Sequence, residues 1–367
     1  MRFRHAKRFT GASLLAIFAV LGTGYRATAD TLPSVVRIGM PASLSPDGKT
    51  LRSSAMGPIL TQTLEKAFAG TGTKIEWKYF VNAGPGINEA FASGQIDFAY
   101  YGDFPAIIAK AGGIDIRLLA PGSRGSSDSD LVVPIDSTAK TIQDLKGKRI
   151  ALNMGRPWML AFERLLGANG LTMADFQIYN LVMPDGDAAV AAHNVDAQVT
   201  LDLDALKLES QGLAKVIWST RTAPLDWKFT AELFGRKAFI DQYPDAAQRV
   251  VTADVTSARY NSDPAHRDDY IRAIAEIAAT PYALEQKAWD NKDTRVVLSP
   301  LFDPFVAAHY TQVIAFAAQN HLIRHKFDVA DLLEPGFDEA ALKTLKLENY
   351  WTPVDAHGTP LKQTAQN

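Results

Sequence analysis

Polar and apolar residues follow two recurring patterns in the part of the chain that starts at residue 35. Residues 35–40 are a short run rich in residues that favour strands, and at 74–81 apolar residues alternate with charged ones, as in a partly buried strand. Between these runs, apolar residues recur every three to four positions over residues 57–68, which predicts a helix with one buried face. The same reasoning predicts strands at 96–101 and 116–119, helices at 87–93 and 103–111, and a turn at 82–86. This alternation of strand and helix favours a parallel sheet covered by helices.

A second unit with the same character begins near Leu131. Its predicted elements are a short helix at 141–145, a strand at 148–152, a helix at 157–166, and strands at 177–182, 197–200 and 215–218. After Pro224 the pattern predicts one more strand at 229–234, followed mostly by helices. These helices are expected at 244–255, 267–280 and 304–320. Strands that alternate with helices again indicate an α/β unit.

The chain passes between the two units near residues 122–133 and again near 219–229. We therefore expect two lobes joined by two crossing strands. Lobe one should contain residues 30–130 and 229–350, lobe two should contain residues 131–228, and residues 351–367 should form a frayed C-terminal tail. Because ligands of open α/β sheets bind outside the carboxyl ends of the strands, this arrangement predicts a cleft between the lobes.

The first 29 residues have the pattern of a secretory signal peptide. Basic residues precede a short apolar run at 12–21, and Ala27 and Ala29 supply the small residues that a signal peptidase recognises. The apolar run is shorter than the about 20 residues that a membrane span needs. We predict cleavage before Asp30, and we favour the periplasm of a two-membrane bacterium as the destination, because no cysteine is present to carry a lipid anchor.

Composition and charge exclude several classes of protein. The chain has 367 residues, of which 47% are hydrophobic, and it has no cysteine. The absence of cysteine excludes a disulfide scaffold, a thiolate zinc site and a cysteine nucleophile. Without the five basic residues of the leader, 33 Lys and Arg remain against 40 Asp and Glu. An acidic body of this kind is a poor partner for nucleic acid, so no nucleic acid partner is expected.

One stretch carries a family resemblance. Residues 83–113 contain Gly84-Pro85, then Gly94-Gln95-Ile96-Asp97-Phe98, then Gly102-Asp103-Phe104-Pro105. This order resembles the aliphatic-sulfonate, taurine and nitrate group of ABC-transporter substrate-binding proteins. Segments 141–150, 195–197 and 239–244 are similar to the same group in the expected order, so the likeness covers nearly all of residues 35–347.

The resemblance implies a fold and a function. The fold would be the two-lobed type II periplasmic-binding-protein fold, an α/β architecture with two mainly parallel sheets flanked by helices. The function would be to close on a small molecule, here an organic sulfonate or a sulfate ester, and to deliver it to an ABC permease with its ATPase. A freely diffusing monomer suits that role. Nitrate and a pyrimidine-type heterocycle are alternative cargoes for the same mechanism.

An anionic head group would be held at helix N-termini, which present free backbone N–H groups and partial positive charge. Two such ends follow predicted strands, and we take the residues around them as ligand-binding candidates. They are Tyr101, Gly102 and Asp103 in lobe one, and Asn153, Gly155, Arg156 and Trp158 in lobe two.

Arg156 is the candidate with the most specific chemistry. It lies at a predicted strand-to-helix turn, where its guanidinium could form paired hydrogen bonds with two anion oxygens. Alternatively, it points to solvent or pairs with a surface acid. The family often has small polar residues in this loop, so Arg156-Pro157-Trp158 is a departure that indicates a larger or more acidic ligand.

Asp103 admits two readings, because a carboxylate beside an anion is unfavourable. We favour a role as the N-cap of the following helix over contact with an amine on the ligand. Tyr100 and Tyr101 cannot face the same side of a strand. The remaining candidates are Ser43 in the loop after the first strand, Asn82 and Gly84 in the predicted turn, and Trp227 beside the second crossing, as a wall for an apolar tail.

Enzyme motifs are absent from the sequence. It has no Gly-x-Ser-x-Gly elbow, no His-Glu-x-x-His motif and no P-loop. His321 and His325 are four residues apart, but the preceding helix should end near Asn320 and no third ligand is evident. We therefore predict a binding protein with no catalytic residues, no metal and no cofactor. An exported sulfate-ester hydrolase and a sensory module remain as alternatives.

Overall fold

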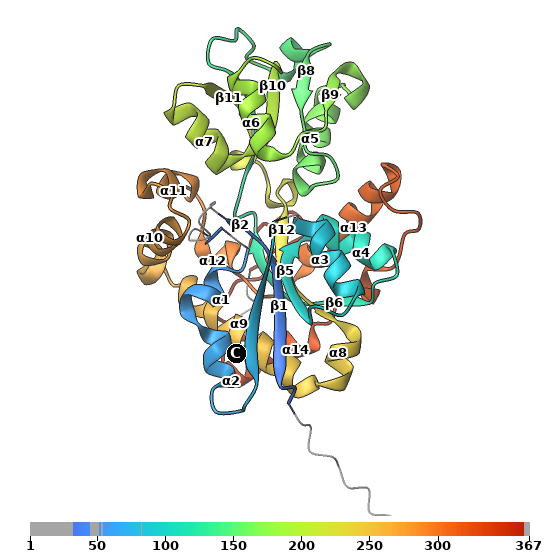
Figure 1. The fold of residues 1–367 in the computed structure, drawn as a ribbon, viewed down its shortest axis with the longest axis vertical. Coiled ribbons are helices and arrows are strands. Elements are labelled where there is room, and N and C mark those ends of the chain that lie inside the picture. The colour runs from blue at the N-terminus through green and yellow to red at the C-terminus, as the bar shows by residue number, and fades with distance from the viewer. Residues whose placement is uncertain (1–31, 45–50, 53, 82, 363–367) are drawn as a thin grey trace, which may run out of the picture. The chain divides into compact units, whose positions relative to one another are not determined.

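The computed structural model describes residues 32–44, 51–52, 54–81 and 83–362. The first sheet has five strands in the order β4-β1-β5-β12-β6 (Figure 1). β1 runs parallel to β4 and β5, whereas β12 runs antiparallel to β5 and β6. The strands are β1 (Val35–Pro41), β4 (Lys74–Phe80), β5 (Phe98–Gly102), β6 (Ile116–Arg124) and β12 (Thr230–Arg236). The predicted strands are confirmed, and β6 extends further than expected because Arg124 pairs with Thr230 of β12.

The second sheet also has five strands, in the order β11-β7-β10-β8-β9. β8 runs parallel to β9 and β10, and β7 runs antiparallel to β10 and β11. The strands are β7 (Ser129–Pro134), β8 (Arg149–Ala151), β9 (Gln177–Tyr179), β10 (Ala197–Leu201) and β11 (Ala214–Ser219). Their helices are η1 (Ile142–Leu145), α5 (Pro157–Ala168), η2 (Met173–Asp175), α6 (Met183–Ala191) and α7 (Asp202–Ser210). Two sheets flanked by helices confirm the predicted α/β fold class. The sheets are mixed rather than mainly parallel, because β12 in the first and β7 in the second run antiparallel to both of their neighbours.

We call the part around the first sheet lobe one and the part around the second sheet lobe two. Lobe one carries more elements, which cover both faces of its sheet (Figure 1). They are β2 (Ser43–Leu44), β3 (Leu51–Arg52), α1 (Met56–Thr61), α2 (Thr63–Phe68), α3 (Ala83–Ala92), α4 (Asp103–Ala111), α8 (Lys237–Gln242), α9 (Pro244–Asn261), η5 (Pro264–His266), α10 (Arg267–Ile277), α11 (Tyr282–Ala288), α12 (Thr294–Val297), α13 (Pro304–Gln319), η6 (Val329–Asp331) and α14 (Gly336–Leu345). The division of the chain into lobe one (30–130 and 229–350) and lobe two (131–228) stays a prediction. None of the helices in the described residues is both long and apolar enough to cross a membrane.

Neighbouring residues of β5 show how the sheet of lobe one separates two cores. Tyr101 packs in a cluster with Phe91 and Phe234, whereas Tyr100 belongs to a cluster with Val250 and Val251 of α9. This confirms that the two tyrosines face opposite sides of the strand.

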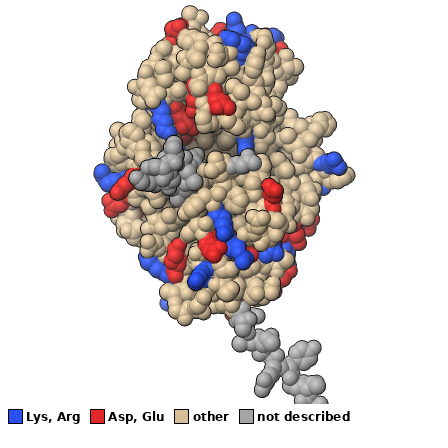
Figure 2. Space-filling view, in the orientation of Figure 1, with Lys and Arg blue, Asp and Glu red and all other residues tan. Residues whose placement is uncertain are grey.

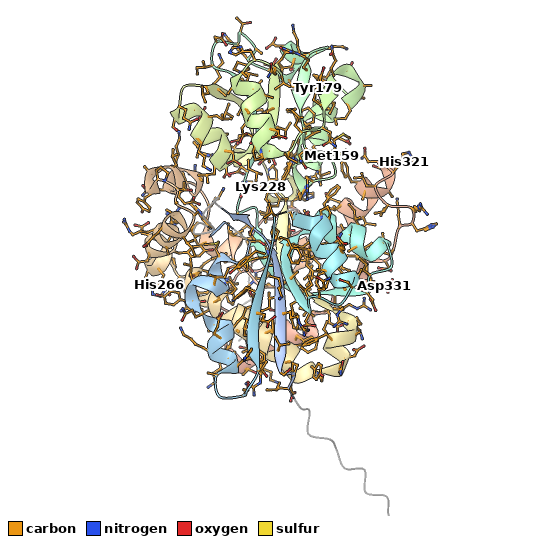
Figure 3. All side chains as sticks on the ribbon, in the orientation of Figure 1. Met159, Tyr179, Lys228, His266, His321 and Asp331 are labelled. Atoms are coloured by element: carbon orange, nitrogen blue, oxygen red, sulfur yellow. The ribbon has the colours of Figure 1, made fainter. Side chains whose placement is uncertain are left out.

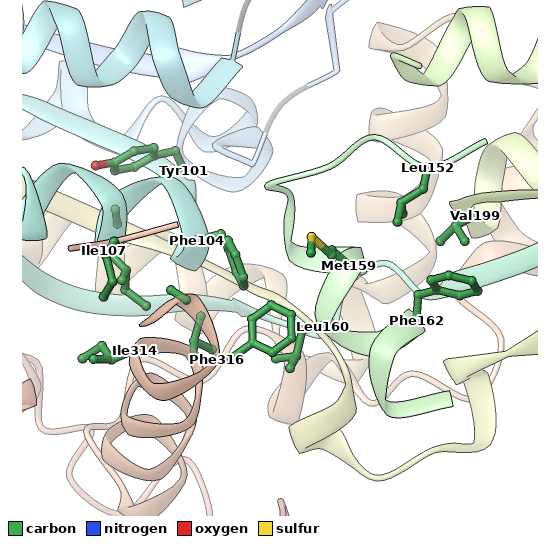
Figure 4. Packing of buried hydrophobic residues seen from close by; sticks show 14 of the residues in the cluster. Tyr101, Phe104, Ile107, Leu152, Met159, Leu160, Phe162, Val199, Ile314 and Phe316 are labelled. Atoms are coloured by element: carbon green, nitrogen blue, oxygen red, sulfur yellow. The ribbon is translucent and has the colours of Figure 1, made fainter. Parts of the chain in front are cut away.

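Apolar side chains also connect the lobes. One cluster of buried residues contains Phe104 and Phe316 of lobe one together with Met159 and Leu160 from α5 of lobe two (Figure 4). Met159 lies at the side of lobe two that faces lobe one (Figure 3). The two lobes therefore share apolar contacts near the start of α5.

Two details of the sequence prediction are wrong. The predicted turn at 82–86 is mostly the first turn of α3, which starts at Ala83. Pro85 suits that place, because the first turn of a helix needs no intrahelical N–H donors. The predicted frayed tail is packed at its start, since Trp351 is only 1% exposed and Val354 is buried. α13 ends at Gln319, before His321, as expected (Figure 3).

Candidate ligand-binding site

A cavity of about 380 Å³ lies between the two lobes. The molecular surface is hollowed between the lobes (Figure 2). Helices that begin at the cavity position most of its wall, since α3, α5 and α6 all start there. The lining residues are Pro85 and Asn88 of α3, Pro105 and Ile108 of α4, Asn153, Met154, Gly155 and Arg156 before α5, and Asn180 and Val182 before α6.

Arg156 supplies the only formal charge among the described residues that line this cavity. It is the N-cap of α5, and Pro157 at the first helical position begins the helix. The guanidinium has no carboxylate within ion-pair distance among the described residues, although it is half-buried. Burial lowers the pKa of Arg156 from its ordinary value. A cation at the positive end of a helix dipole is also unfavourable. A bound anion would compensate both the guanidinium charge and the dipole.

Two asparagines beside Arg156 have their amides oriented by protein donors. Asn153 Oδ1 accepts a hydrogen bond from Arg156 Nε at 3.0 Å, and Asn180 Oδ1 accepts one from the Met154 N–H at 3.0 Å. Because the oxygens are engaged, the Nδ2 donors remain for other partners, and neither has one among the described residues. The cavity thus combines a guanidinium with amide donors, the groups that bind an oxyanion.

Three glycines among the candidates lie close to the cavity or to the boundary between the lobes. A Cβ atom at Gly84 would lie 2.4 Å from Pro105 Cβ and 3.5 Å from Arg156 Nη1, so only glycine lets α3 pack on α4 beneath the guanidinium. A Cβ atom at Gly102 would lie 3.5 Å from Pro157 Cγ across the lobes. Gly155 has a φ of +69°, which glycine adopts without strain. The structure therefore brings together Gly84, Gly102, Asn153, Gly155 and Arg156.

Asp103 is a structural residue rather than an available ligand group. Its carboxylate is buried, with Oδ2 2.6 Å from His309 Nε2 of α13 and Oδ1 accepting from the Phe104 N–H at 2.6 Å. Asp103 is the first residue of α4, and Gly102 is the N-cap. Our expectation of a cap at Asp103 is thus wrong by one residue. Because both oxygens have partners inside lobe one, we omit its carboxylate from the proposed site.

The aromatic candidates do not line the cavity. Tyr101 is fully buried against Phe234, with ring centroids 5.2 Å apart. Trp158 packs on Phe229, with centroids 6.5 Å apart, and Trp227 lies 5.8 Å from the guanidinium carbon of Arg164. None of the three is among the residues that line the cavity, so we leave them out of the proposed site.

Two further candidates fall outside the part of the chain that the structure describes. They are the side chain of Ser43 and the whole of Asn82.

Sequence reasoning missed most of the wall. The missed residues are Pro85, Asn88, Pro105, Ile108, Met154, Asn180 and Val182. Met154 and Val182 are 42% and 53% exposed, which is unusual for such apolar side chains. Both follow strand ends of lobe two, and that position was a usable signal, because such ends face the cleft.

A buried cluster of charges lies near the crossings rather than in the cavity. Lys292 Nζ is 2.6 Å from Asp202 Oδ2 and 3.2 Å from Asp128 Oδ2, and Lys228 Nζ is 2.8 Å from Asp128 Oδ1 (Lys228 is labelled in Figure 3). Burial alone would raise the pKa of Asp128, but Lys292 and Lys228 hold it below its ordinary value. Burial raises the pKa of Asp130 to about 7. These ion pairs join lobe one to lobe two, because Lys292 precedes α12 and Asp202 begins α7.

Comparison with known proteins identifies a family and several relatives of this chain. The family model described as "NMT1/THI5 like" matches residues 68–264. The Bacillus subtilis (strain 168) protein named "Putative aliphatic sulfonates-binding protein" is 25% identical over 314 residues, which cover 84% of this chain and 88% of the relative. The crystal structure titled "putative sulfonate ABC transporter, periplasmic sulfonate-binding protein SsuA" from Methylobacillus flagellatus KT is 40% identical. It covers 89% of this chain and 98% of its own, with a TM-score of 0.78.

The fold extends beyond binding proteins. The crystal structure of the desulfurization enzyme DSZB is 15% identical, covers 85% of this chain and 99% of its own, and has a TM-score of 0.63. At that identity the likeness concerns the fold alone, so fold cannot separate a binding protein from an enzyme.

Proposed function

Because this chain belongs to the NMT1/THI5-like family, we propose that it is the solute-binding component of an ABC importer. It captures an organic sulfonate or a sulfate ester between its lobes and delivers it to a membrane permease. The 40% identity to a sulfonate-binding protein over 89% of the chain supports this cargo.

One observation carries the proposal. Arg156 places a half-buried positive charge, without a carboxylate partner among the described residues, at the N-terminus of α5 and inside a cavity lined by both lobes. A sulfonate or sulfate-ester oxygen would pair with the guanidinium and be stabilised by the positive end of the helix dipole. It would also accept hydrogen bonds from the amide groups of Asn153 and Asn180. The binding site that we propose therefore consists of Arg156, Asn153, Gly155, Asn180, Gly84 and Gly102.

The shape of the cavity favours an organic anion over nitrate. A volume of about 380 Å³ is of the size that accommodates small organic ligands. Ile108 and Pro105 of lobe one and Met154 and Val182 of lobe two give it apolar walls. An alkyl or aryl group attached to the anion would cover these side chains, which nitrate would leave in contact with water.

Location and assembly follow from the same role. We propose that residues 1–29 are a cleaved signal peptide, that the mature protein begins at Asp30, and that it works in the periplasm as a monomer. The periplasmic location of the SsuA relative supports this. We also propose that the protein binds its ligand without chemical turnover.

Calorimetric titration of the mature protein tests the proposal. The ligands are alkanesulfonates, taurine, an aryl sulfonate, an alkyl sulfate, sulfate, nitrate and a pyrimidine. We expect binding of organic sulfonates or sulfate esters, and Arg156→Met should weaken it by more than about 2 kcal/mol, or about 30-fold in Kd. Arg149→Met is the matched control, because Arg149 of the same lobe already pairs with Asp196 at 3.0 Å and should leave the Kd unchanged.

The outcomes separate the alternatives. If only nitrate or the pyrimidine binds, the proposed cargo is wrong, whereas the proposed role in an importer stands. Release of inorganic sulfate from the alkyl sulfate, in proportion to protein concentration, would show an enzyme. If Arg156→Met leaves the Kd unchanged, the ligand does not bind in this cavity.

A further inference from the structure

The C-terminal segment folds into a tight turn, which we call the C-terminal turn, residues 353–361. Val354 pairs with Pro360 across it in an isolated β-bridge. Asp355 Oδ1 accepts hydrogen bonds from the N–H groups of His357 at 2.9 Å and Thr359 at 2.8 Å. Trp351, buried in the core of lobe one, anchors its start. The turn is therefore an ordered element with its own hydrogen bonds.

Leu225 connects this turn to both crossings between the lobes. Leu225 begins η4 (Leu225–Trp227) in the second crossing. A Cβ atom at Gly358 of the turn would lie 2.4 Å from Leu225 Cβ. A Cβ atom at Gly125, in the first crossing, would lie 3.1 Å from Leu225 Cδ1. The leucine side chain is thus packed between the backbones of two glycines, whose φ angles are +88° and +63°.

Polar contacts tie the turn to the same two segments. The Val354 N–H donates to Asp303 Oδ2 at 3.1 Å, and the same oxygen lies 2.7 Å from Arg124 Nη1 at the end of β6, where the first crossing begins. Arg124 and Asp303 are both buried. On the other side, His357 Nδ1 is 3.5 Å from Asp226 Oδ2 in the second crossing. The turn therefore contacts the second crossing directly, at Leu225 and Asp226, and reaches the first crossing through Asp303 and the Leu225 side chain.

We propose that the C-terminal turn is a brace, which holds the two crossings together and thereby sets how readily the lobes separate. Movements between lobes concentrate in a few residues of the connecting segments, and a third segment packed on them restricts those movements. Apparent affinity scales with the fraction of molecules in the binding-competent arrangement. The brace would therefore tune ligand affinity although none of its residues lines the cavity. This inference goes beyond the proposed function, since it concerns how the lobes are held rather than what they bind.

Two substitutions in the full mature chain test the brace. Gly358→Ala puts a methyl group onto Leu225, and Leu225→Ala removes the packed side chain without backbone strain. Gly113→Ala is the matched control, because Gly113 has a nearly equal φ of +90°, but a methyl group there would have no neighbour within 4 Å among the described residues. The measurements are the radius of gyration of the ligand-free protein by small-angle X-ray scattering, and the Kd for butanesulfonate by calorimetry.

We expect both brace variants to be more expanded than wild type without ligand, and to bind butanesulfonate at least 5-fold more weakly. Gly113→Ala should lower the melting temperature and leave the radius and the Kd unchanged. If Gly358→Ala and Leu225→Ala keep the wild-type radius and Kd, the brace is refuted. If butanesulfonate does not bind the wild-type protein, the proposed cargo is wrong. The scattering of the ligand-free variants then tests the brace by itself. Expansion of both brace variants relative to Gly113→Ala supports the brace, and no expansion overturns it.

Discussion

Replacement of Lys292 by methionine should destabilise the fold strongly, because this lysine neutralises buried carboxylates from two parts of the chain. Its ammonium group lies 2.6 Å from Asp202 Oδ2 and 3.2 Å from Asp128 Oδ2, and it donates to the Ser126 carbonyl oxygen at 2.8 Å. The side chains of Lys292, Asp202 and Asp128 are all buried. Removing one partner of such a group typically costs about 3 to 5 kcal/mol, since an uncompensated charge remains.

The geometry places the expected loss at the lower end of that range. In Lys292→Met, Asp128 keeps Lys228 at 2.8 Å, whereas Asp202 loses its ion-pair partner among the described residues. One uncompensated carboxylate gives about 3 kcal/mol, a large share of the roughly 5 to 15 kcal/mol that holds a typical domain folded. Lys292→Met with Asp202→Asn should recover part of this loss, because no ionised group then remains at residue 202.

The pH dependence provides a sharper check. Burial already raises the pKa of Asp202, and loss of Lys292 raises it further. A carboxyl whose folded pKa is raised binds its proton more readily in the folded state, so its stabilising contribution is lost as the pH rises through that pKa. The free energy of unfolding that Lys292→Met loses relative to wild type should therefore be larger at pH 8 than at pH 5.

Urea unfolding at the two pH values measures both effects. Lys110→Met is the control, because Lys110 pairs with the exposed Asp115 at 2.7 Å and should cost no more than about 1 kcal/mol. Equal losses in the two variants, or a Lys292→Met deficit that does not change with pH, would refute the reasoning.

Two other substitutions probe features of lobe one. Asp338 is buried, and burial raises its pKa to about 8, so its contribution to stability is lost as the pH rises toward 8; Asp338→Asn should raise the melting temperature at pH 8.5 and change it little at pH 4. Equal effects at both pH values would contradict this. Gly84→Ala should cost about 1 to 3 kcal/mol in urea unfolding, because the new methyl group would meet Pro105 Cβ at 2.4 Å. Gly167→Ala, in an open helical position, is its control and should be neutral or stabilising.

The sequence predicted the strands well because their signal is local. Alternation at 74–81 and apolar runs at 35–40 and 96–101 reflect burial on one or both faces of a strand, and each run became a strand of the first sheet. Arg156 was also identifiable, since a charged residue between a strand and a helix faces the end of the sheet where ligands bind. The two lobes followed from the two crossings of the chain near 122–133 and 219–229, and the family resemblance implied the same architecture.

The predictions that failed are those that depend on contacts between segments far apart in the sequence. Whether Tyr101 faces the core or the cleft is decided by Phe234 of β12 and Phe91 of α3, which pack on it. Asp103 is engaged by His309, 206 residues further along the chain. Trp351 was assigned to a loose tail because no periodic pattern surrounds it, yet lobe one buries it. No local window contains these partners, so local patterns could not reveal them.

The apolar cluster that spans the lobes has a thermodynamic consequence. Opening the lobes would transfer parts of Phe104, Phe316, Met159 and Leu160 into water. Hydration of apolar surface carries a large heat capacity, so closure around a ligand should have a negative heat-capacity change. The enthalpy of ligand capture should then become more favourable on warming, while cooling weakens the apolar contribution to closure. The lobes would thus be held together less firmly in a cold environment than in a warm one.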